Sequence, residues 1–334
     1  STYHTLTGGY RNKIDGGSNC IGQFIGGGAL NVTSAPYATV LGGSYNSSSC
    51  DHSTVVGGTN NRTLGSYSVT AGGSNNLTVG SYSNINGGTN NTTCNQLSSI
   101  NGGRLNTVKA ICSNIGGGSN NSINGVSSTS ILGGYLNEIS GSGNYGNIGG
   151  GSSNLIYGAT CAASILGGEN NKIRHGCNDS ILGGCFNVIQ NEEFDSQNTI
   201  VNGTLNKITG SRASAIVAGT SMSVKCSDYS MIGSGRNNST TDSRGSFIGG
   251  GFTNSVSCAD YSFIGGGANN VALNPAHYSV IAGGRYNETV CFSFVGGGCN
   301  NCITGQASAI VGGCNNTIST YYSGILGGQS NTVA

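Results

Sequence analysis

Ser308-Ala309-Ile310-Val311-Gly312-Gly313-Cys314-Asn315-Asn316-Thr317-Ile318 is one copy of a pattern that recurs along the whole chain. The pattern reads Ser-x-Ile-x-Gly-Gly-x-x-Asn-x-Ile, and its asparagine is the most regular marker. From residue 12 to residue 331 there are 21 markers, so 20 steps cover 319 residues and the mean period is about 16. Repeats this short cannot bury an apolar face alone, so they predict a solenoid of stacked coils. Met222 occupies one marker place, and the others are Asn12, Asn31, Asn46, Asn61, Asn76, Asn91, Asn106, Asn121, Asn137, Asn154, Asn171, Asn187, Asn206, Asn238, Asn254, Asn270, Asn287, Asn301, Asn316 and Asn331.

The composition agrees with one long repeat domain. The 334 residues include 61 Gly, 2 Pro and no Trp, and only 7% of them are charged. We expect residues 1–334 to form a single repeat solenoid that is a segment of a longer fibre chain, with the longest turn insertions near 15–22 and 190–198. A net charge of +1 without a Lys/Arg cluster argues against nucleic acid as a partner. The apolar runs are too short for membrane insertion.

Two positions in each coil are predicted to face inward. The residue two before the first glycine is aliphatic in every coil except at Thr70. The residue two after the marker asparagine is Thr or Ser in early coils, such as Thr33, and Val or Ile in many later ones, such as Ile123. This pattern predicts an all-β fold, a parallel β-solenoid of about 21 coils. Each coil should hold two strands of about three to five residues, joined by a Gly-Gly corner and a looser polar turn.

The glycines and the asparagine have different physical reasons. A corner that needs positive φ, or that a neighbouring coil approaches closely, tolerates no Cβ atom. Asparagine amides stacked at a strand spacing of about 4.8 Å can hydrogen-bond along the stack and satisfy backbone groups of the turn. The marker asparagines are therefore predicted to form a structural ladder.

A second apolar column is predicted on the outside of the coils. The residues three and one before the first glycine flank an inward residue and should be polar, yet one of the two is usually bulky and apolar. Solvent would not enforce this pattern, whereas a packed interface would. We predict parallel assembly of identical chains about a three-fold axis. The interface candidates are Phe24, Leu41, Val56, Leu132, Leu166, Leu182, Val201, Val217, Met231, Phe247, Phe263, Phe294, Val311 and Leu326.

The same column becomes polar in some coils. Asn84, Asn86, Asn101, Asn114 and Asn147 stand where other coils carry the apolar group or its small neighbour. In a three-fold assembly these side chains would converge on the axis around water or a small anion. The alternative is that they are ordinary exposed asparagines.

The repeat resembles those in the heads of trimeric autotransporter adhesins of the Yersinia adhesin type. It is also similar to Gly-Gly-x-x-Asn arrays in fibres of phages and large viruses. The resemblance covers nearly the whole chain and implies a left-handed β-roll, three identical chains, and attachment of a cell or virion to a surface. Handedness and the number of chains are implied by the resemblance alone.

The 13 cysteines depart from the bacterial pattern. Their odd number and irregular spacing do not read as a secreted disulfide framework, which favours a virion exterior over a bacterial surface. Two pairs lie one coil apart at equivalent corners, Cys161 with Cys177 and Cys299 with Cys314, close enough in principle for a bridge. Cys299 and Cys302 form a C-x-x-C without a second ligand pair, so no zinc site is expected.

Several tyrosines are expected to face outward near the looser turn, because each precedes an inward small residue. Aromatic faces beside Asn and Ser are typical of sugar-binding surfaces. The alternative is that these rings pack against the turn of a neighbouring subunit. The tyrosines at this place are Tyr37, Tyr67, Tyr82, Tyr145, Tyr229, Tyr261, Tyr278 and Tyr322, and the candidates for glycan contact are Tyr67, Tyr82, Tyr229, Tyr261 and Tyr278.

No catalytic residues and no cofactor are predicted. The 12 acidic residues are mostly isolated, and glycoside hydrolysis needs two carboxylates at one bond. Glu192, Glu193 and Asp195 do cluster, as a solvated turn or a weak metal site. The favoured function is a structural or attachment segment of a fibre or spike on the exterior of a virion or cell, with a host glycan or receptor as possible partner. The first alternative is a polysaccharide-binding or polysaccharide-cleaving fibre domain, and the second is an ice- or surface-binding solenoid.

Overall fold

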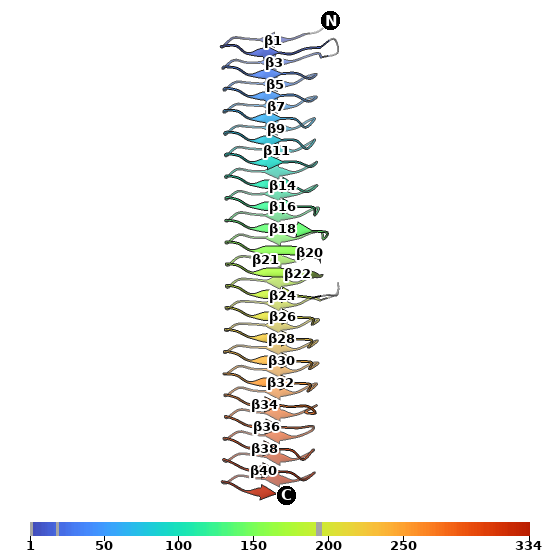
Figure 1. The fold of residues 1–334 in the computed structure, drawn as a ribbon, viewed down its shortest axis with the longest axis vertical. Coiled ribbons are helices and arrows are strands. Elements are labelled where there is room, and N and C mark those ends of the chain that lie inside the picture. Colours follow the sequence, from blue (N-terminus) through green and yellow to red (C-terminus); the bar gives the residue numbers. More distant parts are fainter. Residues whose placement is uncertain (1–2, 18–19, 192–195) are drawn as a thin grey trace. The chain divides into compact units, whose positions relative to one another are not determined.

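The computed structural model describes residues 3–17, 20–191 and 196–334. The described chain is all-β and contains no helix, so none of it could cross a membrane as a helix. It is a parallel β-solenoid of about 20 turns with two strands per turn and a period of about 16 residues, which confirms the predicted fold class. The solenoid comprises two compact units, Ser1–Ala162 and Ala163–Ala334. Within each unit, Figure 1 shows successive coils stacked one on the next.

In the first unit, each strand pairs in parallel with the equivalent strand of the next coil. The odd-numbered strands form one sheet: β1 (Thr5–Leu6), β3 (Phe24–Ile25), β5 (Thr39–Val40), β7 (Thr54–Val55), β9 (Val69–Thr70), β11 (Asn84–Ile85), β13 (Ser99–Ile100), β15 (Asn114–Ile115), β17 (Ser130–Ile131) and β19 (Asn147–Ile148). The even-numbered strands form the other: β2 (Lys13–Ile14), β4 (Val32–Thr33), β6 (Ser47–Ser48), β8 (Arg62–Thr63), β10 (Leu77–Thr78), β12 (Thr92–Thr93), β14 (Thr107–Lys109), β16 (Ser122–Asn124), β18 (Glu138–Gly141) and β20 (Leu155–Cys161).

The second unit repeats this arrangement. Its odd-numbered strands are β21 (Ser164–Ile165), β23 (Ser180–Ile181), β25 (Thr199–Ile200), β27 (Ala215–Ile216), β29 (Met231–Ile232), β31 (Phe247–Ile248), β33 (Phe263–Ile264), β35 (Val280–Ile281), β37 (Phe294–Val295), β39 (Ala309–Ile310) and β41 (Gly324–Ile325). Its even-numbered strands are β22 (Lys172–Cys177), β24 (Val188–Gln190), β26 (Lys207–Thr209), β28 (Ser223–Lys225), β30 (Ser239–Thr241), β32 (Ser255–Ser257), β34 (Val271–Ala272), β36 (Glu288–Thr289), β38 (Cys302–Ile303), β40 (Thr317–Ile318) and β42 (Thr332–Val333).

Most strands have only two residues, so the predicted length of three to five was wrong for most coils. The reason is that a coil of about 16 residues must turn at several places. One coil of the first unit has left-handed backbone at Tyr67 (φ 57°), at Gly73 (φ 83°) and at Asn75 (φ 56°). Each left-handed residue ends an extended segment, because φ in a strand is negative.

The inward positions build a narrow core. Ile85, Ile100 and Ile115 are fully buried in neighbouring coils and pair in register along the first sheet. Thr70, the exception among the aliphatic residues, is also fully buried. Its Oγ1 lies 2.8 Å from Thr63 Oγ1 and 2.9 Å from Thr78 Oγ1, so the hydroxyl is satisfied inside the core.

Within each unit, the asparagine ladder joins successive coils, except between Met222 and Asn238, where the marker is not an asparagine. Asn91 Nδ2 donates to Gly87 O and Gly103 O, both at 3.0 Å, and Asn91 Oδ1 accepts from Asn106 N at 3.0 Å. Each of the other ladder asparagines likewise donates from Nδ2 to the carbonyl four residues before it. The ladder continues through the longest coils, because Asn206 N donates to Asn187 Oδ1 at 3.1 Å across 19 residues.

The Gly-Gly corner needs glycine most strictly at its second place, whereas the first place has room for a side chain in most coils. A Cβ atom on Gly88, where φ is 87°, would lie 2.1 Å from Gly103 O and 2.5 Å from Asn91 Nδ2. A Cβ atom on Gly87 would meet nothing within 4 Å. The chain itself uses this freedom, since Asn202 and Ser234 occupy the first place in later coils.

Candidate functional site

The apolar column lies on the outward side of the odd-numbered strands and directly after them. We call its 14 residues, given above as interface candidates, the apolar stripe. Eleven of them are exposed, among them Leu132 at 59% and Leu166 at 53%, while Phe24, Met231 and Phe247 are half-buried. Within each unit, a single chain therefore leaves a column of large apolar side chains in contact with solvent.

The pairing of phenylalanine with glycine in this stripe has a cause within the coil. A Cβ atom on Gly26 would lie 2.5 Å from Leu41 O in the next coil and 3.2 Å from Cε1 of Phe24. Gly265 has the same close approach to the next coil and lies under the ring of Phe263. The ring covers a backbone that cannot carry a side chain, so local packing explains part of the alternation that the sequence showed.

The asparagines that interrupt the stripe form hydrogen bonds on the surface of one chain. Asn84 Nδ2 donates to Asn86 Oδ1 at 2.8 Å, and Asn86 Nδ2 donates to Asn101 Oδ1 at 3.2 Å. Asn114 Oδ1 accepts from Ser99 Oγ at 2.8 Å, as Asn147 Oδ1 does from Ser130 Oγ at 2.9 Å. Their convergence on an axis stays a prediction.

In the looser turn, the residue two places before each odd-numbered strand from β3 onward has left-handed backbone, and we call this series the turn column. In the first unit Tyr37, His52, Tyr67 and Tyr82 follow one another in the column. Their ring centroids are 4.6, 4.6 and 5.1 Å apart, and the rings are nearly parallel. Tyr67 thus has a ring over each face and presents its edge to solvent, which does not suit a sugar platform.

A second stack lies in the second unit, where Tyr261, Tyr278 and Phe292 have centroids 5.2 and 5.4 Å apart. Tyr278 is covered on both faces. The sequence analysis considered only tyrosines and therefore missed His52 and Phe292. Both precede an inward serine, as most tyrosines of the column do, and this signal was available in the sequence.

Tyr229 is arranged differently from the stacked rings. It is 56% exposed, and no ring stacks on it in the described part of the chain. Its neighbours in the turn column are Ala213 and Gly245, which have no ring to offer. The guanidinium carbon of Arg244 lies 5.5 Å from the Tyr229 centroid.

Basic and acidic residues alternate directly before the turn column in five successive coils of the second unit. They are Arg212, Asp228, Arg244, Asp260 and His277, and we call them the charged column. Arg212 donates to Asp228 Oδ2 from Nη2 at 2.9 Å and from Nε at 3.1 Å. Arg244 N donates to Asp260 Oδ1 at 2.7 Å. The repeat pattern did not reveal this column, because its members share a place in the coil but not a residue type.

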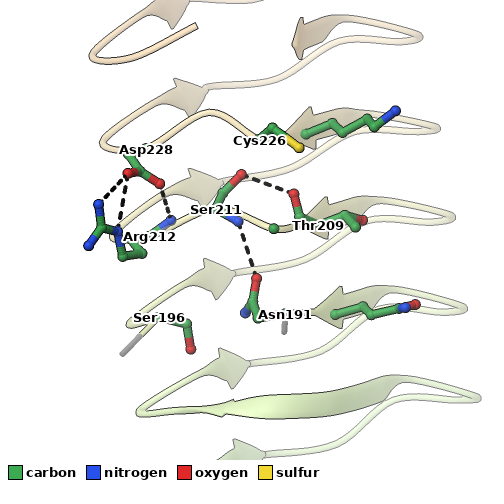
Figure 2. Close-up of a pocket in the computed structure, with 10 residues that line it drawn as sticks. Asn191, Ser196, Thr209, Ser211, Arg212, Cys226 and Asp228 are labelled. Carbon is green, nitrogen blue, oxygen red and sulfur yellow. Dashed lines mark hydrogen bonds and ion pairs between the residues drawn. The ribbon is translucent and has the colours of Figure 1, made fainter. Parts of the chain in front are cut away.

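Two hollows flank the charged column. The larger, of about 480 Å³, is shown in Figure 2 and is lined by polar side chains of the long coil and its successors, including Asn191, Thr209, Ser211, Arg212 and Lys225. The smaller, of about 330 Å³, is lined by Asp242, Ser243, Arg244 and Asp260 among others. Gly210, Cys226 and Asp228 line both hollows.

Asp179 is a buried carboxyl group in the coil before the 19-residue coil that runs from Asn187 to Asn206. Burial raises its pKa from 3.8 to about 6, although hydrogen bonds from Asn198 N (2.8 Å) and Asn191 Nδ2 (3.0 Å) act in the opposite direction. The predicted acidic cluster of Glu192, Glu193 and Asp195 lies outside the described residues. Within the described ranges, no group of three or more His, Cys, Asp or Glu is placed to hold a metal ion.

Cys299 and Cys314 form a disulfide between adjacent corners, with Cα atoms 4.6 Å apart. Cys302 is a free thiol whose pKa is raised by burial and by the nearby Glu288 carboxylate. The threonines two places after the ladder asparagines face inward as predicted: Thr33, Thr63 and Thr78 are fully buried and present no outward array to an ice surface.

Comparison with known proteins adds no assignment. No protein-family model matches the chain, and no curated protein matches it.

Proposed function

We propose that the chain is a structural and attachment segment of a homotrimeric fibre or spike on the exterior of a virion or cell. The observation that carries the proposal is the apolar stripe, which a single chain leaves exposed along the first sheet of each unit. When a neighbouring chain covers an apolar side chain that is half exposed, the burial contributes about 1 kcal/mol to the free energy of association. A column of such side chains therefore gives parallel copies of the chain a substantial reason to associate.

A trimer is the assembly that we favour, on the strength of the resemblance to trimeric adhesin heads and of the symmetry of closed oligomers. Identical chains in parallel register would place equivalent coils at the same height. The stripe of each chain would then be covered continuously by its neighbours. Each binding surface would be present in three copies per coil level, so weak contacts would add through avidity.

Light scattering on the purified chain tests the proposal. We expect a mass of about three times the 33.4 kDa of one chain, under reducing conditions as well as oxidising ones. A monomer at micromolar concentration would contradict it. The apolar stripe would then require a partner other than this chain.

A further inference from the structure

Asn202 stands where most coils have the first glycine of the corner, and Gly203 follows it. Gly203 N donates to Asn202 Oδ1 at 2.6 Å, so the side-chain amide of Asn202 is turned toward the next peptide nitrogen. Because a C=O bond is about 1.23 Å long, the amide carbon Cγ lies within about 3.8 Å of that nitrogen. The two atoms are therefore close to the separation of about 3–3.5 Å from which bound groups react.

The backbone around this pair is held in place, whereas the nitrogen of Gly203 is not part of the ladder. Asn202 N donates to Val217 O at 3.1 Å, and Asn202 O accepts from Asn206 Nδ2 at 3.0 Å. Gly203 N has no other acceptor among the described residues. Gly203 also carries no Cβ atom that would screen its nitrogen. The corner thus keeps an accessible peptide nitrogen beside the side-chain amide of the preceding residue.

The chain contains four Asn-Gly sequences, and the other three hold the asparagine side chain differently. Asn86 Nδ2 donates to Asn101 Oδ1 at 3.2 Å, which engages the amides of both residues. Asn124 Nδ2 donates to Ser122 Oγ at 2.8 Å. Asn202 is exposed, and its Nδ2 bonds no group in the described ranges. Its amide nitrogen can therefore leave into solvent, while its amide carbon stays close to Gly203 N.

We propose that Asn202 is a site of spontaneous deamidation, at which Gly203 attacks the side chain before it. Gly203 N loses its proton to solvent base and forms a bond to Asn202 Cγ. The Cγ–Nδ2 bond breaks, Nδ2 takes up a proton from solvent, and ammonia leaves a five-membered succinimide ring. Water then adds to one of the two ring carbonyls, and the ring opens to an aspartate or an isoaspartate at position 202. Solvent water is the only co-reactant.

Both products change the corner. Each places a carboxylate directly after Val201 of the apolar stripe. The isoaspartate also routes the main chain through the former side chain, so the carbonyl that accepted from Asn206 Nδ2 becomes part of the new carboxylate. The inference goes beyond the proposed function, because the reaction needs only one chain. What the new charge does to assembly rests on the proposed function.

Peptide mapping by mass spectrometry tests the site on the full chain, incubated at neutral pH and physiological temperature. We expect Asn202 to deamidate at least about tenfold faster than Asn86 and Asn124 in the folded chain, because a misplacement of about 1 Å can cost about 100-fold in rate. The urea-denatured chain is the matched control, since it keeps the Asn-Gly sequences and removes their geometry. There the rates of all four sites should agree within about threefold.

Two variants separate the reaction from the fold. Asn202→Gln keeps a carboxamide but requires a six-membered ring, so its deamidation should be at least about tenfold slower. Asn202→Gly restores the Gly-Gly corner of most other coils and should keep the circular dichroism while abolishing the reaction at this position.

Two outcomes would overturn the site. One is an unmodified position 202 in the folded chain after a time in which the denatured chain reacts. The other is a rate at Asn202 in the folded chain that does not exceed the rate at Asn86. A monomeric mass in light scattering would refute the trimer and leave the expected deamidation unchanged, so the two proposals fail separately.

Discussion

Met222 is a residue at which the ladder lacks its usual chemistry. It is 1% exposed, and its own backbone N–H donates to Asn206 Oδ1 at 3.0 Å as in other coils. A thioether cannot return that bond, so it supplies neither the amide donor nor the acceptor that each ladder asparagine gives its neighbours. The coil keeps its register but loses up to three hydrogen bonds.

Met222→Asn should therefore stabilise the second unit. An asparagine here would donate to the carbonyls of Ala218 and Gly235 and accept from Asn238 N. These bonds should outweigh the lost burial of the methionine, for a net gain of about 1 kcal/mol in the free energy of unfolding. Urea denaturation measures it. The reverse change Asn254→Met is the control and should cost about 2–4 kcal/mol, because it leaves buried groups unpaired. A destabilised Met222→Asn variant would refute this account of the ladder.

Asp179 makes a pH-dependent contribution at the same scale. Its pKa is raised from 3.8 to about 6 by burial, so the folded chain holds the proton more tightly than the unfolded chain. The stabilisation is complete below pH 3.8 and is lost as the pH rises through about 6. The difference of about two between the folded and unfolded pKa values of Asp179 corresponds to about 3 kcal/mol in the free energy of unfolding.

We expect the Asp179→Asn variant to gain stability relative to the natural chain as the pH rises, by about 3 kcal/mol between pH 3.5 and 7. Urea denaturation of both proteins at several pH values measures the difference in their free energies of unfolding. The contributions of the other carboxyl groups are the same in both proteins and cancel in this difference. Stability curves that run parallel over this range would contradict the assignment.

At the scale of the element, the turn column shows what a coil gains from its neighbours. A tyrosine at positive φ is an uncommon conformation, yet Tyr67 and Tyr82 adopt it in successive coils and stack at 5.1 Å. Aromatic pairs of this kind contribute about 0.5–1.5 kcal/mol beyond their burial. The stack therefore offsets a local conformational cost by contacts between coils.

Tyr67→Ala should lower the free energy of unfolding by about 1–3 kcal/mol, because Tyr67 touches the rings of both His52 and Tyr82. Tyr145→Ala is the matched control. Tyr145 is 66% exposed, has the same left-handed backbone, and is flanked in the column by Ser128 and Ala162. Its loss should change stability by less than about 0.5 kcal/mol. Equal effects of the two substitutions would show that stacking contributes nothing.

The elements differ in how far the sequence predicts them. The inward residues, such as Ile100, and the ladder asparagines repeat in type and place, so periodicity locates them. The left-handed corners do not repeat in type: Leu105, Asn120 and Tyr45 all adopt positive φ before a ladder asparagine. Residue identity alone therefore cannot show where a strand ends. The charged column stayed hidden for the same reason, since Asp228 and Arg244 are equivalent in place and opposite in charge.

At the scale of the whole molecule, fold class and period follow from the sequence, whereas assembly depends on surfaces that a single chain leaves open. The apolar stripe is the most prominent of these open surfaces. A substitution there should be nearly neutral for one chain and costly for an assembly, and this difference makes it a useful probe.

Leu132→Glu should lower the light-scattering mass to that of a monomer and leave the far-UV circular dichroism unchanged. Leu132 is 59% exposed in one chain, so the new carboxylate is solvated unless a neighbour covers it. Leu97→Glu introduces the same charge at 57% exposure on the turn column and should keep the original mass. A Leu132→Glu variant that still assembles would exclude this part of the stripe from the interface.

The pairing register has a consequence for inheritance. Ile85 pairs with Ile100, and Asn91 bonds Asn106, so each coil depends on partners a single period away. Excision of residues 77–91 would bring Asn76 to Thr92 and leave the next marker at its usual distance of 15 residues. Replication errors that add or remove one whole period would thus produce a protein that still folds. The length of such a chain is then set by the number of coil-encoding repeats in its gene, and selection can adjust that length in steps of one coil.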